Sequence, residues 1–224
     1  MRCIIREQPY EKLLAAGHFR FQKNGESTGV EEIWRLTDLI EGYRNLRIEV
    51  DARNSNSGET TLYHLVINPS GQPERLKIRK FSAGSAISGD VHLESKALVI
   101  YSDIDGKRFE HELAPPEGYL FVVPSVIWFG FLVAGNRSQL DVPAASFSQE
   151  YDLRPLENTI NLKRLGSKKV NVSGFDIDVR TFQVDWLGQR CHLSVDQYDC
   201  VVEVLYEEGL VAKETRYIRH LKYQ

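Results

Sequence analysis

Apolar and polar residues alternate one by one along most of this 224-residue chain, and this alternation limits its fold more than any other feature. Between Leu46 and Arg53 every second residue is apolar and the others are charged. This pattern is typical of a β-strand with one buried face and one solvated face. Similar runs follow after Asn- and Gly-rich turn segments. The sequence therefore predicts a three-stranded meander over 46–53, 61–68 and 74–81.

The same pattern continues through the rest of the chain. Alternation runs from Val91 to Tyr101, and it returns from about residue 170 to residue 217. A slip in its phase predicts a β-bulge near Thr181. We therefore predict a mainly β protein, a strongly curved antiparallel sheet of about ten or more strands that forms a half-barrel or open barrel, with one or two short helices.

Two segments are candidates for helix. The run from Pro9 to Ala16 has proline early and is followed by Gly17, which are helix start and stop signals. The segment 119–134 contains no charged residue. It can be read as a membrane span, as two buried strands broken at Pro124, or as a strand followed by a buried helix from Ser125. A span needs about 20 apolar residues, so the second and third interpretations are favoured, and both stay open.

The domain organisation follows from length and rhythm. A β-sheet domain can reach 224 residues, so we predict a single domain over 1–224. The segments 1–136 and 156–224 share the meander theme, which suggests pseudo-repeat halves joined by a loop over 137–155.

The charge and the N-terminal residues argue against binding to nucleic acid and against insertion into a membrane. The net charge of −3 creates no strong field for nucleic acid. The basic residues Arg75, Lys77, Arg79 and Lys80 lack interleaved aromatics on the same face, so we expect a solvated surface there. The N-terminal residues contain no signal-peptide core. We therefore expect a cytoplasmic protein without a transmembrane segment.

The three cysteines fit that location. Cys3 stands alone, whereas Cys191 and Cys200 flank a predicted hairpin turn at 196–199. In the expected register Cys191 faces Val204, which separates the two sulfurs by about 13 Å along the ladder. That distance is too long for a disulfide. We therefore predict three free thiols.

No catalytic or metal-binding motif stands out. The six histidines have no partner at the spacing of a metal site. The serines lack a nucleophile elbow, and the segment 84–89 lacks the lysine of a phosphate loop. Pairs of acids such as Asp176 and Asp178 share a strand face but alternate with core residues. An enzyme is therefore less favoured than a binding protein, and no cofactor or metal is expected.

Aromatic residues on apolar faces are the most informative candidates. They either pack a closed core or line an apolar cavity, and cavities of this kind bind apolar ligands. The predicted ligand-binding residues are Trp34, Phe121, Trp128, Phe129, Phe131, Phe182 and Trp186.

The order of elements resembles that of bacterial half-barrel proteins of the lipoprotein-localisation-factor type (LolA/LolB-like). The residues that carry the resemblance are Gly17-His18-Phe19-Arg20-Phe21, Glu32-Ile33-Trp34-Arg35-Leu36, the meander over 46–81 and the closing set over 170–217. It implies a long sheet curled around helices, with a concave apolar face that takes lipid or acyl chains. This sequence departs from the exported members of the family, which carry a signal peptide.

Two functions are compatible with these features. The first is a binding protein for an apolar or lipid-like small molecule, held between the concave sheet and the segment 120–133. The alternative is a protein–protein interaction module, or a structural protein without a small-molecule ligand.

Overall fold

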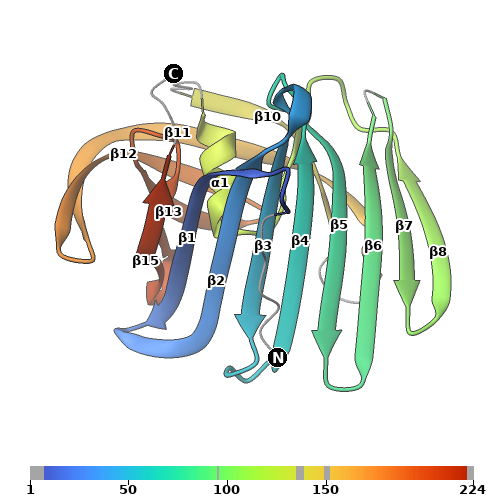
Figure 1. Ribbon diagram of the computed structural model, residues 1–224, viewed down its shortest axis with the longest axis horizontal. Helices are drawn as coiled ribbons and strands as arrows, with labels where there is room; N and C mark the ends of the chain where they lie inside the picture. Colours follow the sequence, from blue (N-terminus) through green and yellow to red (C-terminus); the bar gives the residue numbers. More distant parts are fainter. Residues whose placement is uncertain (1–7, 95, 135–138, 149–151, 221–224) are drawn as a thin grey trace.

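The computed structural model describes residues 8–94, 96–134, 139–148 and 152–220, and it is dominated by β-strands. The first half of the chain forms one long meander (Figure 1). Its strands are β1 (Lys12–Lys23), β2 (Glu26–Asp38), β3 (Arg44–Ala52), β4 (Glu59–Ile67), β5 (Pro73–Ser82), β6 (Ser85–Leu93), β7 (Leu98–Ile104) and β8 (Lys107–Leu113).

The second half contains the helix and the remaining strands. Two single-turn 3-10 helices, η1 (Ile40–Gly42) and η2 (Glu207–Gly209), lie in connections. The other elements are β9 (Leu120–Phe121), α1 (Val126–Val133), β10 (Gln139–Phe147), β11 (Pro155–Val172), β12 (Phe175–Trp186), β13 (Gln189–Val195), β14 (Val201–Tyr206) and β15 (Leu210–Arg219).

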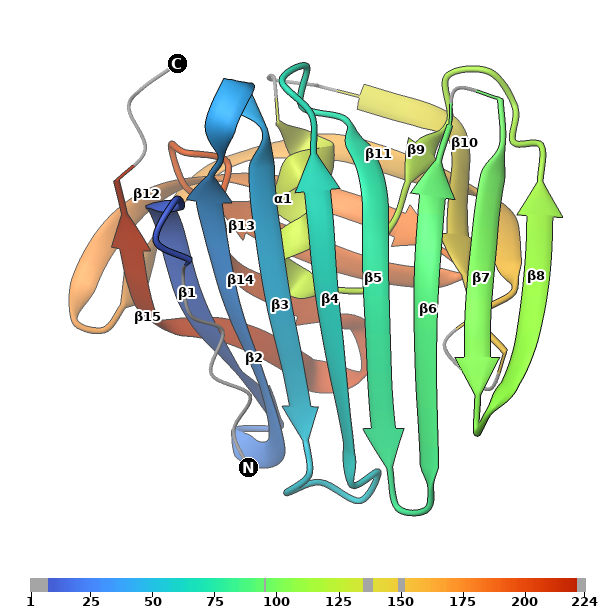
Figure 2. The same ribbon diagram turned by 45° about the vertical axis from the view of Figure 1, so that its right-hand side comes forward.

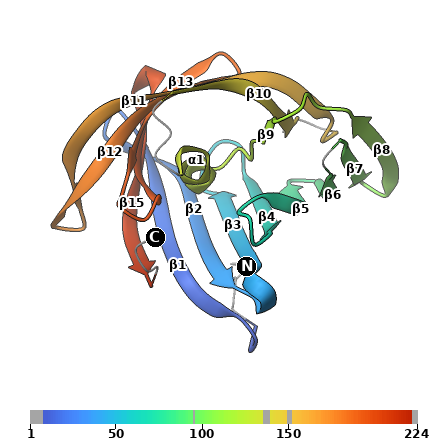
Figure 3. The ribbon, with the colours of Figure 1, turned by 90° about the horizontal axis from the view of Figure 1, so that it is seen from above.

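All fifteen strands belong to one continuous sheet that is not closed. Their order is β8-β7-β6-β5-β4-β3-β2-β1-β15-β14-β13-β12-β11-β10-β9. Neighbours are antiparallel, except that β9 runs parallel to β10. Figure 2 shows the strands of the first-half meander side by side, and Figure 3 shows the whole sheet curved around α1. The predicted curved antiparallel sheet with an open barrel shape is confirmed.

The predicted meander is confirmed in β3, β4 and β5. Alternate apolar residues of these strands are buried in the core, namely Leu46, Ile48, Tyr63, Leu65, Ile67, Leu76 and Ile78.

The phase slip near Thr181 is not a bulge of β12. Ile177 and Val179 pack in a small core apart from the main one, whereas Phe182 and Val184 belong to the main core. A bulge does lie in the neighbouring strand. The register shifts between Arg164 and Gly166 of β11, which lie opposite Phe182 and Thr181 of β12. The extra residue of this bulge is therefore in the partner strand.

The predicted helix over Pro9 to Ala16 is wrong. Residues from Lys12 onward form β1, which pairs with β2 on one side and with β15 on the other. Gly17 does not end a helix there. A Cβ atom at this position would collide with Trp34 of β2 and Glu214 of β15, so glycine lets two large side chains cross the strand.

The helix expected from Ser125 onward is present as α1. It lies on the concave face of the sheet (Figure 3) and is buried nearly all round. Gly130 lets it approach closely, because a Cβ atom there would meet the backbone oxygen of Asp199 in the β13–β14 turn. No helix of the described residues is long and apolar enough to cross a membrane.

Two further expectations need correction. The segment 137–155, expected as a connecting loop, contains β10, whose residues pair with β11 along nine positions. The predicted hairpin register is also wrong, because Cys191 faces Tyr206 rather than Val204. The turn is longer than expected, and a bulge follows at Val202. Cys191 and Cys200 are nevertheless free and buried, as predicted, and Cys3 lies outside the described residues.

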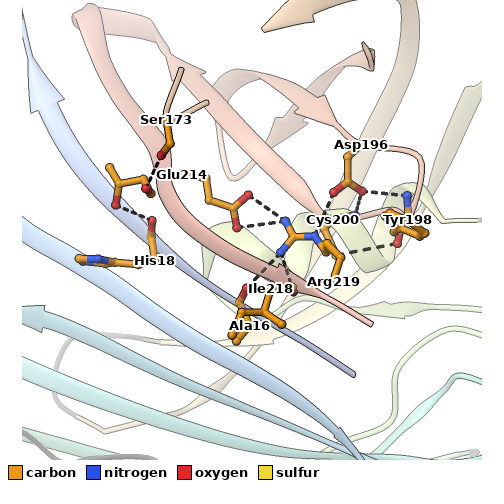
Figure 4. A network of polar contacts seen from close by, with 10 residues as sticks. Ala16, His18, Ser173, Asp196, Tyr198, Cys200, Glu214, Ile218 and Arg219 are labelled. Atoms are coloured by element: carbon orange, nitrogen blue, oxygen red, sulfur yellow. Dashed lines mark hydrogen bonds and ion pairs between the residues drawn. The ribbon is translucent and has the colours of Figure 1, made fainter. Parts of the chain in front are cut away.

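A buried polar cluster joins the two halves of the sheet where β1 pairs with β15 (Figure 4). The guanidinium group of Arg219 donates to both carboxylate oxygens of Glu214 at 3.0 and 2.8 Å, and to Asp196 at 3.0 Å. It also donates to the backbone oxygen of Ala16 and lies over the ring of Trp34, 5.1 Å from the centroid.

Two carboxylates thus share one guanidinium group in a buried site. Burial and the nearby Asp196 charge together raise the pKa of Glu214 to about 8, although Arg219 opposes the rise. Asp196 also accepts hydrogen bonds from the backbone N–H groups of Tyr198 and Cys200, which fixes the β13–β14 turn. The cluster therefore ties the last strand to the first strand and to that turn.

Candidate functional site

A pocket of about 250 Å³ lies at the N-terminal end of α1. The helix and the segment before it form one wall, β1 to β3 form a second, and β12 to β14 form a third. We call it the α1 pocket. Its apolar lining includes Val30, Val50, Val126, Phe129, Val184 and Trp186.

Glu32 is the charged residue of this pocket wall. It lies on β2 in phase with Trp34 and Leu36, so its side chain points to the concave face and is buried. Oε1 accepts hydrogen bonds from Ser125 Oγ and the Ile127 backbone N–H, both at 3.0 Å. Oε2 accepts one from the Val126 backbone N–H at 2.9 Å.

These contacts make Glu32 the N-terminal cap of α1. The side chain of Ser125, at the usual capping position, makes no capping bond of its own. The first N–H groups of a helix have no partner within the helix and carry a partial positive charge, so a carboxylate there is favourable. Burial nevertheless dominates and raises the pKa of Glu32 to about 7, although the three hydrogen bonds oppose the rise.

Tyr206 and Cys191 lie opposite each other on β14 and β13, and both line the pocket. Burial raises the pKa of Tyr206, and the charges of Cys191 and Glu32 raise it further. Burial also raises the pKa of Cys191 to about 12. The thiol is therefore protonated at neutral pH and is a poor nucleophile.

Two of the seven predicted ligand-binding residues line the α1 pocket. Phe129 of α1 and Trp186 of β12 meet edge to face, with their ring centroids 6.2 Å apart. The indole N–H of Trp186 donates to Asn158 Oδ1 at 2.8 Å, which fixes the ring. The structure therefore brings together one aromatic residue from the helix and one from the sheet, as expected for cavity walls.

Two others line a smaller cavity of about 170 Å³ at the opposite end of the helix. Trp34 and Phe131 contribute to it, together with Arg44 and the β13–β14 turn. Trp34 is buried, and its indole N–H has no hydrogen-bond partner within the described residues. These two residues are separated from the α1 pocket by the helix itself.

The remaining three do not line the α1 pocket. Phe182 of β12 is fully buried in the main hydrophobic core. Trp128 donates its indole N–H to the backbone oxygen of Phe121 at 2.9 Å and stacks on Phe131. Phe121 packs against Phe147, 6.2 Å between centroids. The prediction of a single site made of all seven residues is therefore not what the structure shows.

Sequence reasoning missed Glu32 and Tyr206. A signal for Glu32 was present, because a charge in phase with Trp34 and Leu36 must face the core. The same signal was present for Glu214, which is in phase with buried Ala212. Such an inward charge is costly unless it has partners, so it marks a position with a specific role.

The described residues contain no group of three or more His, Cys, Asp or Glu side chains that could hold a metal ion. No family model matches the chain, and neither curated proteins nor solved structures provide a match. The relationship to LolA/LolB-like proteins therefore stays a prediction.

Proposed function

We propose that this protein binds a small apolar or amphipathic molecule in the α1 pocket. The observation that carries this proposal is the position of the pocket. It lies beside the N-terminal end of α1, measures about 250 Å³, and is lined by residues of the helix and of strands from both halves of the sheet. Pockets with mostly apolar walls and a few converging polar groups are typical ligand sites.

The size of the pocket narrows the ligand class. Pockets for drug-sized ligands measure roughly 300–1,000 Å³, whereas a cavity of roughly 150 Å³ already holds benzene. With about 250 Å³, the α1 pocket suits a single ring with a short substituent or a short aliphatic chain. A long acyl chain, as the resemblance would imply, would extend beyond it.

Binding of toluene tests the proposal directly. Methyl NMR spectra of the valine residues should show saturable shifts at four positions that line the pocket, Val30, Val50, Val126 and Val184. A second set of valines provides an internal control. Val170, Val172, Val179 and Val202 form a separate small core and should not shift.

A filling variant completes the test. Val30→Phe places a larger side chain in the pocket wall and should abolish the toluene shifts. Val66→Phe is the matched control, because Val66 is a half-buried valine on the outward face of β4. Unchanged toluene binding by Val30→Phe, or no binding by the native protein, would contradict the proposal. Absence of binding would favour the interaction-module alternative.

A further inference from the structure

The ionisable side chains that line the α1 pocket, among the described residues, are all acids. Its lining side chains include three groups that can lose a proton, Glu32, Cys191 and Tyr206. Within the described part of the chain, no lysine, arginine or histidine lines it. Two neighbouring cavities differ, because Lys80 lines one and Arg44 lines the other. The α1 pocket therefore offers hydrogen-bond acceptors and one carboxyl group, Glu32, and no cationic side chain of the described residues.

Glu32 also has unused capacity as an acceptor. A carboxylate accepts about four hydrogen bonds, and Glu32 accepts three from the described residues, of which only one goes to Oε2. All three donors are neutral N–H or O–H groups. An ionised carboxylate that is buried without a full positive charge is costly, so a cation close to Oε2 would stabilise the charged form.

Tyr206 provides a second contact of the same kind. Its side chain lines the pocket from β14, and that of Glu32 lines the same pocket from β2. A ligand group with several N–H donors could bind Glu32 and Tyr206 together, while Phe129 and Trp186 enclose an apolar body.

We infer that the ligand of the α1 pocket is a small apolar amine, with its ammonium group at Glu32 and Tyr206 and its ring or short chain between Phe129 and Trp186. This inference rests on the proposed function, since it assigns the head group of the same ligand. It also excludes fatty acids and phosphorylated head groups, because an anion would meet Glu32 with no cation to balance it.

A series of four molecules of similar shape separates the head group from the apolar body. Benzylamine, benzyl alcohol, toluene and benzoate carry a cation, a neutral donor, no polar group and an anion on the same ring. Binding is followed at pH 8 by methyl NMR of the four valines that line the pocket. Benzylamine should bind at least about tenfold more tightly than toluene, the effect of one charge-assisted hydrogen bond. Benzoate should bind most weakly.

Glu32→Gln tests the assigned contact. The variant keeps the shape of the side chain but removes its charge, so the ratio of benzylamine affinity to toluene affinity should fall to about one. Toluene binding also reports whether the variant keeps an intact pocket. Glu31→Gln is the matched control, because the neighbouring Glu31 faces outward and pairs with His18 and Arg20.

The outcomes separate this inference from the proposed function. If toluene binds but benzoate binds as well as benzylamine, the head-group assignment is wrong and the pocket stands. The assignment is also wrong if Glu32→Gln keeps the preference for the amine. If none of the four molecules binds the native protein, the proposed function fails, and the inference fails with it.

Discussion

Replacing Glu32 with glutamine should make the stability of the protein less dependent on pH. The folded protein raises the pKa of Glu32 to about 7 from an ordinary value of 4.5, because burial disfavours its charged form. The folded state therefore binds a proton more tightly than the unfolded chain. The stability that Glu32 contributes is fully present below pH 4.5 and is lost as the pH rises towards 7.

The magnitude follows from the two pKa values. A difference of about 2.5 pKa units corresponds to about 3 kcal/mol, at about 1.4 kcal/mol per unit. Glutamine has no such titration. It retains one acceptor oxygen for α1, but its amide N–H₂ group faces a helix N–H donor. That mismatch should cost about 1 kcal/mol at low pH, and at pH 8 the variant should become the more stable protein.

Urea unfolding of both proteins at pH 4.5 and pH 8 measures this effect. The free energy of unfolding of Glu32→Gln relative to the native protein should shift by about 3 kcal/mol in favour of the variant between the two pH values. Other titrating groups cancel in this double difference. Glu31→Gln should show no comparable shift. The reasoning is refuted if the difference between Glu32→Gln and native protein is the same at both pH values.

Three further predictions concern the strands around the pocket. Arg219→Met should lower the free energy of unfolding by about 3–5 kcal/mol, because it leaves two buried carboxylates without their cation; Arg20→Met, at an exposed ion pair, should cost less than about 1 kcal/mol in the same urea experiment. Gly17→Ala should lower the melting temperature, since its methyl group would collide with side chains from both neighbouring strands, and an unchanged melting temperature would contradict that packing. In a Cys3→Ser variant, Cys191 and Cys200 should react with a thiol reagent only after unfolding, because both thiols are buried and protonated. Rapid labelling of the native protein would contradict this prediction and show that the sheet opens locally.

The regular strands could be predicted because they depend on a local pattern. Alternation between Leu46 and Arg53 predicts one buried face, and Leu46 and Ile48 are indeed buried there. The helix after Pro124 could also be predicted in part, because Ser125 precedes it and no charge interrupts it. These features depend on residues that are neighbours in sequence.

The errors arose where distant segments decide the structure. Residues up to Ala16 carry helix end signals, yet pairing with β2 and β15 makes them a strand. Glu32 caps a helix that begins more than ninety residues later in the chain. Neither contact leaves a local pattern in sequence. For the same reason the seven aromatic residues could be placed on apolar faces, but their division among a pocket, a smaller cavity and the core could not be foreseen.

The pairing of β1 with β15 has a consequence for how the chain folds. Among the described strands, every other pair of neighbours in the sheet is consecutive in sequence, and all of these pairs except β9 and β10, which α1 connects, are joined by short connections. The seam between β1 and β15 instead joins residues such as Ala15 and Arg219. Folding rates fall as the mean sequence separation of contacts rises. Joining the two ends and opening the chain between β8 and β9 would make every pair of neighbouring strands consecutive in sequence, and β15 and β1 would then be joined as a hairpin.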